Sequence, residues 1–422
     1  MLLTPVLILI AILSLSCGPA PHPFQNPNDP ACESAACSGG GSSTASTSSP
    51  GSPSGSETGK SVVNEGAPTG SAYNFASSFS VTPQGCLNVD RVQIFENDSG
   101  LMVFLKANCG ERSHVYGLRT SYSGTVEGSP ILLSPDCNTG TIGVTGFTVD
   151  RSQTSYLLVY VCKDATYKTR ILPVSKDLTL GSSVVLESQT TDSSYEIVWN
   201  ESALAFGLVR KKQFQRLSET GVSIGGPINI ADFLINQLVV DEGSWMIAHR
   251  ILSGGYVTTY ASSISSSGIL GCNGANPGIS HFGTNNYGAY GLFSGKNRFV
   301  HFAGVSNGDQ ADFVAAELDP TTCKKIGSES ANAAISNTGK PYTVLGGILL
   351  NASTGSVLFS TAKSLILATY PRSGAFKLYA ESSIAGFTLL HYSTARIIQG
   401  KIYVAYGKDG AGYISYSNES IP

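Results

Sequence analysis

The stretch VDRSQTSYLLVYVC (residues 149–162) contains the end of one strand, a polar turn and a second, strongly apolar strand. Its β-branched and aromatic residues favour strands, and its short polar residues favour the turn. The same shape recurs six times, at FENDSGLMVFLKAN (95–108), VWNESALAFGLVR (198–210), VVDEGSWMIAHR (239–250), LFSGKNRFVHFAG (292–304), LLNASTGSVLFSTA (349–362) and ARIIQGKIYVAYG (395–407). The pattern indicates a repeated β unit.

The apolar strands of these units begin near residues 101, 156, 203, 245, 298, 357 and 401, so six intervals span 300 residues and average 50. A period of about 40–55 residues with four strands in each unit is typical of a β-propeller. Around the quoted stretch the four strands are TIGVTGFTV (141–149), SYLLVYVCK (155–163), YKTRILPV (167–174) and SSVVLES (182–188).

We therefore predict an all-β fold over residues 72–422, a seven-bladed β-propeller of four-stranded antiparallel blades. The last unit has only three strands, and AYNFASSFSV (72–81) is expected to supply its outer strand. Closing the ring in this way removes exposed sheet edges. A pair of β-sandwiches or a β-helix is the competing fold.

The amino-acid composition limits which classes of partner are expected. Charged residues make up 13% of the 422 residues, about half the usual share. The net charge of −3 gives no electrostatic reason to expect a nucleic-acid partner.

The N-terminus contains one long apolar run, at residues 6–15. A helix needs about 20 apolar residues to span a bilayer, so this run is predicted to be the core of a secretory signal peptide over residues 1–16. Residues 17–71 are rich in Ser, Gly and Pro and almost free of large apolar side chains. They cannot bury a core and are expected to form a flexible tether.

The five residues LSLSC (13–17) resemble a bacterial lipobox, with Ser14 where that motif usually has Leu. The resemblance implies that the protein is exported and that Cys17 carries a lipid that anchors it to a membrane. Because Gly18 rather than Asp follows Cys17, it also implies the outer membrane of a Gram-negative bacterium. The alternative is ordinary signal-peptide cleavage that leaves Cys17 unmodified.

The nine cysteines fit an exported protein, because a lipidated Cys17 leaves an even number for disulfides. Zinc is the alternative role, but the chain has neither a CxxC motif nor clustered histidines, so no metal site is predicted. The expected pairs are Cys32–Cys37 in the tether, Cys86–Cys109 and Cys137–Cys162 within blades, and Cys272–Cys323 between successive blades.

No catalytic signature emerges from the chain. GVSIG (221–225) matches the nucleophile elbow of serine hydrolases, but a strand-like segment follows it where that motif needs a helix, so we expect a turn. The WD dipeptide and the sialidase-type Asp-box of other propellers are absent, so no functional residue is carried over. No catalytic residue and no cofactor is predicted.

One local run is basic, RKKQFQR (210–216). It is predicted to form the hairpin between the second and third strands of the third blade, with Phe214 exposed. Such a hairpin could contact an acidic partner, and a hairpin that is only solvated is the alternative. The candidate partner-binding residues are Arg210, Lys211, Lys212, Phe214 and Arg216.

These observations favour a monomeric, envelope-anchored binding or scaffolding lipoprotein whose partner is an envelope protein or a glycan, with the lipid as its only membrane contact. A hydrolase or lyase with its active site at the mouth of the propeller channel is the alternative. A secreted glycan-binding adhesin is the third possibility, and its candidate stacking residues are Tyr256, Tyr260, Tyr287 and Tyr290.

Overall fold

The computed structural model describes residues 73–75, 77–137, 142–163, 166–189, 195–210, 212–232, 234–241, 243–253, 256–278, 290–295, 298–307, 310–336, 343–351, 354–360, 364–371, 377–378, 382–384 and 394–420. The predicted signal peptide, Cys17, the tether and the Cys32–Cys37 pair lie outside these residues. The described residues form 29 strands, and none of them forms a helix long and apolar enough to cross a membrane.

The strands of the first four blades follow one another along the chain. They are β2 (Leu87–Asn97), β3 (Gly100–Asn108), β4 (Ser113–Ser121) and β5 (Val126–Leu132); β6 (Gly143–Arg151), β7 (Ser155–Lys163), β8 (Tyr167–Ser175) and β9 (Val184–Gln189); β10 (Tyr195–Asn200), β11 (Ala205–Arg210), β12 (Gln213–Leu217) and β13 (Ser223–Asn229); and β14 (Leu234–Asp241), β15 (Ser244–Ser253), β16 (Tyr256–Ser265) and β17 (Leu270–Ala275).

The last three blades follow the same order, except that the outer strand of the sixth is split into β25 and β26 and that of the seventh is β1. Their strands are β18 (Tyr290–Gly295), β19 (Arg298–Asn307), β20 (Gln310–Leu318) and β21 (Lys325–Ser336); β22 (Thr343–Asn351), β23 (Thr354–Ser360), β24 (Ser364–Pro371), β25 (Lys377–Leu378) and β26 (Ser382–Ser383); and β27 (Ala395–Ile398), β28 (Lys401–Lys408), β29 (Ala411–Tyr416) and β1 (Ser77–Ser80).

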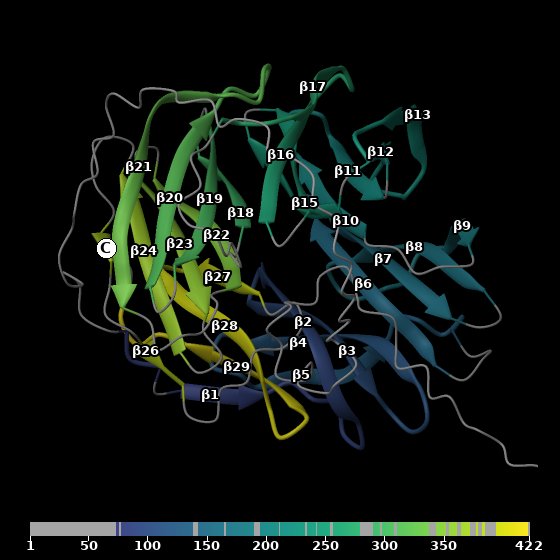
Figure 1. Ribbon diagram of the computed structural model, residues 1–422. Coiled ribbons are helices and arrows are strands. Elements are labelled where there is room, and N and C mark those ends of the chain that lie inside the picture. The colour runs from purple at the N-terminus through teal and green to yellow at the C-terminus, as the bar shows by residue number, and fades with distance from the viewer. Residues whose placement is uncertain are drawn as a thin grey trace, which may run out of the picture. The chain divides into compact units, whose positions relative to one another are not determined.

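The seventh blade joins the two ends of the propeller. Figure 1 shows β1, in purple, beside yellow β29, and the two strands pair antiparallel from Ser77 opposite Tyr416 to Ser80 opposite Tyr413. The prediction that the segment before residue 82 completes the last blade is therefore confirmed. The strand itself is shorter than the predicted stretch.

The seven blades form a closed ring. The innermost strands lie next to one another in the order β6, β10, β14, β18, β22, β27 and β2. The step from β2 back to β6 is made by Gln93, whose Oε1 accepts the backbone N–H of Val149 at 3.0 Å. The all-β, seven-bladed propeller with four-stranded antiparallel blades is thus the fold of the chain.

The core lies between adjacent blades and is built from their apolar second strands. Leu101 to Leu105 in β3 are fully buried, and so is most of β7. Between the third and fourth blades, Trp245 fits against Gly207, where a Cβ atom would lie 2.5 Å from the indole nitrogen. A small residue at position 207 is therefore required for the two sheets to pack.

A five-residue turn repeats between the third and fourth strands of the first four blades. Its first residue is always Ser, whose Oγ accepts the backbone N–H of the fifth residue. The fourth residue has a positive φ, as at Gly221 (φ 78°). The segment GVSIG (221–225) therefore begins in this turn and continues into β13, so a strand rather than a helix follows its first two residues. The four turns begin at Ser121, Ser175, Ser218 and Ser265.

Three disulfides occur in the described residues, and their pairing agrees with the prediction. Cys86 bonds Cys109 in the first blade, and Cys137 bonds Cys162 in the second. Cys272 in β17 bonds Cys323 in the turn before β21, so this bridge links the fourth blade to the fifth. Disulfides are compatible with an exported protein.

Candidate functional site

Of the seven charged residues on the innermost strands of four successive blades, five form a group that is coupled electrostatically. We call them the axial cluster, because these strands form the inside of the ring. They are separated by up to 305 residues in sequence, from Arg91 to Arg396, and their charges act on one another in the folded chain. The members are Arg396 on β27, Arg91 on β2, Asp150 and Arg151 on β6, and Glu196 on β10.

Asp150 forms a hydrogen bond between the second blade and the third. Its Oδ2 accepts the backbone N–H of Trp199 on β10 at 2.7 Å. Burial raises the pKa of the Asp150 carboxyl, and the charges of Arg396 and Arg151 and two backbone N–H bonds oppose that rise. The charges of two arginines and two backbone N–H groups thus offset part of the rise that burial causes in the pKa of this carboxyl.

Glu196 is the second carboxyl of the axial cluster. Burial raises its pKa as well, the charge of Arg91 opposes the rise, and the charge of Asp150 adds to it. The guanidinium of Arg91 is itself buried and lies 5.1 Å from the centroid of the Phe147 ring. Two carboxyls with raised pKa values thus share one region with three guanidinium groups.

Arg396 and Arg151 are the two members of the axial cluster whose side chains are exposed to solvent. Desolvation by the surrounding protein nevertheless lowers the pKa of Arg396, and Asp150 opposes the decrease. The guanidinium lies 4.6 Å from the centroid of the Phe95 ring. Arg396 thus combines an exposed side chain with a contact to the buried Phe95 ring.

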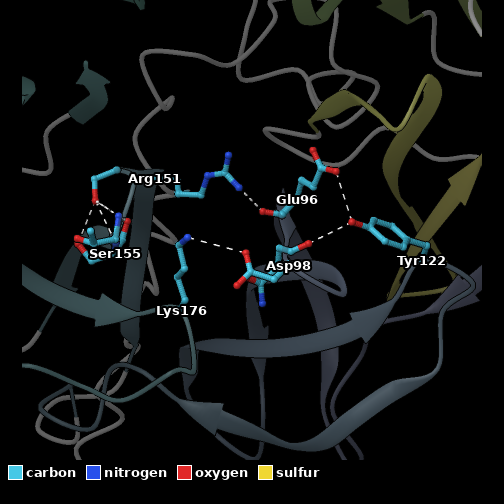
Figure 2. Close-up of polar contacts among 9 residues, drawn as sticks. Glu96, Asp98, Tyr122, Arg151, Ser155 and Lys176 are labelled. Carbon is cyan, nitrogen blue, oxygen red and sulfur yellow. Dashed lines mark hydrogen bonds and ion pairs between the residues drawn. The ribbon is translucent and has the colours of Figure 1, made fainter. Parts of the chain in front are cut away.

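At the turns of the first two blades the cluster continues into a polar rim (Figure 2). Arg151 donates a hydrogen bond to the carbonyl of Glu96, and the Tyr122 hydroxyl donates to the carbonyl of Asn97 at 3.1 Å. Nearby, Lys176 Nζ lies 3.9 Å from Asp98 Oδ1. Such exposed pairs contribute less than about 1 kcal/mol each, so the rim orients side chains more than it stabilises the fold.

The basic hairpin forms between β11 and β12, as predicted. Arg210 pairs with Glu187 of β9 at 2.7 Å, and Lys212 pairs with Asp232. Arg216 donates to the carbonyl of Ser266 in the fourth blade at 3.1 Å. Two of these cations therefore connect the third blade to its neighbours, and Lys211 lies outside the described residues.

The expectation that Phe214 is exposed was wrong. Its side chain is fully buried, with its ring 5.1 Å from that of Trp245. Phe214 is opposite Val209 across the hairpin, on the face that packs against the fourth blade. The alternation of a strand places it there, although its sequence neighbours are polar.

In the described residues, neither His249 on β15 nor the candidate stacking residue Tyr260 belongs to a second charged cluster. His249 is buried and lies 2.9 Å from Ser262 Oγ through its Nε2, and burial lowers the pKa of His249 to about 4. Tyr260 is half-buried. The side chains of Tyr256, Tyr287 and Tyr290 lie outside the described residues. No group of His, Cys, Asp and Glu suited to a metal ion occurs in the part of the chain that is described.

A second surface, which sequence reasoning missed, consists of large apolar side chains in turns. We define the turn patch as Leu204 (67% exposed), Val222 (64%) and Ile269 (68%). These residues lie in turns at one end of the third and fourth blades. A Cβ atom on Gly243 would lie 3.1 Å from Ser202 and 3.8 Å from Ser266, so two of the turns are adjacent. Arg216, on β12 just before the turn of Val222, donates to the carbonyl of Ser266 in the turn of Ile269.

Two carboxylates border the turn patch. Glu201, in the turn of Leu204, accepts the indole N–H of Trp199 at 2.8 Å. Glu219, in the turn of Val222, accepts the hydroxyl of Thr154 at 2.9 Å. Turns normally present polar residues, so three exposed aliphatic side chains beside two acids form an unusual surface. Sequence alone could have flagged the aliphatic residues only if the turns had been recognised.

No protein-family model matches the chain, and no curated protein matches it. Among solved structures, it is similar to the WD40 domain of coronin from Toxoplasma gondii, with 9% identity, a TM-score of 0.47 and coverage of 83% of this chain and 90% of that one. It is also similar to the β-propeller domain of the Trilobed protease from Pyrococcus furiosus, with 8% identity, a TM-score of 0.48 and coverage of 79% and 95%. At such identities the likeness concerns the fold alone.

Proposed function

We propose that the protein is an envelope-anchored binding or scaffolding lipoprotein that contacts a protein partner through the turn patch. The β-propeller fold serves protein interaction or scaffolding at a general level. The observation that carries the proposal is the exposure of Leu204, Val222 and Ile269 in neighbouring turns. Exposed apolar residues that gather on one surface mark interaction sites more often than scattered ones do.

The chemistry of the turn patch favours a protein over a glycan. Its centre is aliphatic, formed by Leu204, Val222 and Ile269, and Glu201 and Glu219 lie beside it. An apolar protein segment flanked by Lys or Arg would complement both features. The partner expected is therefore an envelope protein with a basic rim around an apolar contact.

The basic hairpin is a separate candidate surface, and the partner predicted for it is acidic. Arg210 and Arg216 connect blades and Lys212 pairs with Asp232, so an acidic partner would compete with these contacts. A variant that carries Lys211→Glu and Lys212→Glu separates this surface from the turn patch.

The test compares two triple variants of the full-length protein extracted from envelopes. Light scattering measures the size of the complex that each variant forms with its protein partner. Leu204→Ser, Val222→Ser and Ile269→Ser together are expected to abolish the complex. The matched control changes Val126, Val184 and Val185 to Ser, since these are exposed on the outer strands β5 and β9, and is expected to retain it. If both triple variants lose the complex, or if both retain it, the turn patch is not the binding surface.

Anchoring has its own test. We expect the mature N-terminal peptide from the membrane fraction to begin at a diacylglycerol-modified Cys17, and Cys17→Ala to leave the membrane fraction. An unmodified N-terminus in the soluble fraction would contradict the lipoprotein proposal and favour a freely secreted protein.

A hydrolase or lyase at the ring axis is the second candidate. The observation in its favour is the pair of carboxyls with raised pKa values, Asp150 and Glu196, on adjacent inner strands. Such perturbed groups gather at active sites. Activity on envelope glycan fragments that disappears in both Asp150→Asn and Glu196→Gln would favour this candidate.

A further inference from the structure

Trp199 lies beside the turn patch, because it is near the end of β10 and the turn of Leu204 follows it. Its side chain is partly exposed, and its ring packs edge-on against the buried Phe206 with 4.8 Å between the ring centroids. The indole N–H donates to Glu201 Oε2 at 2.8 Å, and the backbone N–H donates to Asp150. The ring is therefore held in place before a partner binds, so little conformational entropy is lost on contact.

The carboxylates of Glu201 and Glu219 are oriented by two consecutive residues of the second blade. Gln153 donates to Glu201 through its side-chain amide, and the hydroxyl of Thr154 donates to Glu219 Oε1 at 2.9 Å. These donors are neutral, as is the indole of Trp199. In the part of the chain that the structure describes, neither carboxylate forms an ion pair.

Two arginines adjoin the turns that carry these groups, and both bind backbone carbonyls. Arg151 donates to the carbonyl of Glu96 in the first blade, and its charge acts on Asp150. Arg216 donates to the carbonyl of Ser266 in the fourth blade at 3.1 Å. An arginine from a partner therefore meets two carboxylates that no cation of the described residues contacts.

We propose that the partner places an arginine side chain over the Trp199 ring, with its guanidinium bound to the carboxylates of Glu201 and Glu219. Tryptophan offers the strongest cation–π face of the aromatic side chains. A guanidinium stacks on such a ring and donates in its own plane to a carboxylate, which an ammonium cannot do. Aliphatic residues on either side of that arginine then cover the turn patch. The inference rests on the proposed function and defines the chemistry of the partner segment.

The first experiment measures whether the ring is accessible and lies in a negative potential. The chain has two tryptophans, Trp199 and Trp245, and Trp245 is fully buried, so collisional quenchers of fluorescence reach Trp199. Quenching constants for caesium and iodide are measured on the full-length protein at one ionic strength, each relative to N-acetyltryptophanamide. Caesium is expected to quench at least about twofold more strongly than iodide. Equal relative constants, or no quenching by either ion, overturn the proposal.

Variants assign this potential to the two carboxylates. When Glu201→Gln and Glu219→Gln are combined, the difference between caesium and iodide should disappear. The matched control combines Glu111→Gln and Glu127→Gln, because these residues are exposed in the turn between β3 and β4 and on β5. The control should behave as the wild type. Loss of the difference in the control as well would indicate an effect of net charge and overturn the assignment.

The second experiment titrates the full-length protein with two acetylated and amidated peptides, Gly-Val-Leu-Arg-Leu-Val-Gly and the same peptide with a central Gln. Tryptophan fluorescence reports binding. The arginine peptide is expected to bind the wild type at least about fivefold more tightly than the glutamine peptide. In the Glu201→Gln, Glu219→Gln variant this preference should fall below about twofold, because only the ring remains. Equal affinities of the wild type for the two peptides, or no binding of either, overturn the proposal.

The complex with the native partner separates this inference from the proposed function. The Glu201→Gln, Glu219→Gln variant is expected to weaken that complex at least about tenfold. If this variant binds as tightly as the wild type while the triple Ser variant of the turn patch loses the complex, the arginine site is wrong and the turn patch stands. If the triple Ser variant retains the complex, the proposed function itself is wrong.

Discussion

Asp150 of the second blade accepts, through Oδ2, the backbone N–H of Trp199 in the third blade at 2.7 Å. The inner strands β6 and β10 belong to different sheets and share no hydrogen-bond ladder, so this N–H needs a side-chain acceptor. One blade earlier, Gln93 does the same for Val149. Side chains of one inner strand thus bind the backbone of the next.

The first prediction concerns this bond. Asp150→Ala leaves the Trp199 N–H without its acceptor and removes the charge that opposes Arg396, and it should lower the free energy of unfolding by about 2–4 kcal/mol. Asp150→Asn keeps an oxygen acceptor and should cost less than half as much. Urea denaturation measures both. Equal and small losses would show that the bond contributes little.

The second prediction concerns pH. Burial lowers the pKa of His249 to about 4 from an ordinary 6.5. Between these values the unfolded chain binds a proton that the folded chain does not, so the stability falls as the pH drops from about 6.5 to about 4. The total effect is up to about 3 kcal/mol.

The measurement for His249 is urea denaturation at several pH values for wild type and His249→Gln. The variant should lose less stability than the wild type between pH 6.5 and pH 4. Parallel curves would contradict a neutral, buried His249.

The third prediction concerns the bridge between the fourth and fifth blades. Replacing both Cys272 and Cys323 by Ser opens a link with a sequence separation of 51 residues. On the chain-entropy model this should lower the free energy of unfolding by about 4 kcal/mol. Denaturation of the double variant beside the wild type, both oxidised so that the other two bridges persist, measures the difference. No change in stability would mean that packing alone joins these blades.

Much of the fold is predictable from sequence because each blade repeats a local pattern. The apolar second strand that follows a polar turn can be recognised from the residues alone, as in β7. A serine that begins each turn between the third and fourth strands, such as Ser218, would have strengthened the repeat further. Cysteine spacing predicted the pairs because equivalent positions recur in successive blades.

The axial cluster could not be predicted, because it depends on how separate blades meet. Arg91, Asp150, Glu196 and Arg396 are far apart in the chain, and nothing local to any of them signals the others. The burial of Phe214 could not be predicted for a related reason. Its polar neighbours suggested exposure, whereas the packing of the fourth blade, with Trp245 against Gly207, determines that its face is buried.

The most direct test of the binding proposal is site-specific photo-cross-linking in intact cells. A photoreactive amino acid replaces Leu204 in the turn patch or, as a control, Val126 on the outer strand β5. We predict one discrete protein adduct from position 204 and none from position 126. The adduct should disappear when Val222 and Ile269 are both changed to Ser. Equal adducts from both positions, or no adduct from position 204, would contradict a partner-binding role for the turn patch.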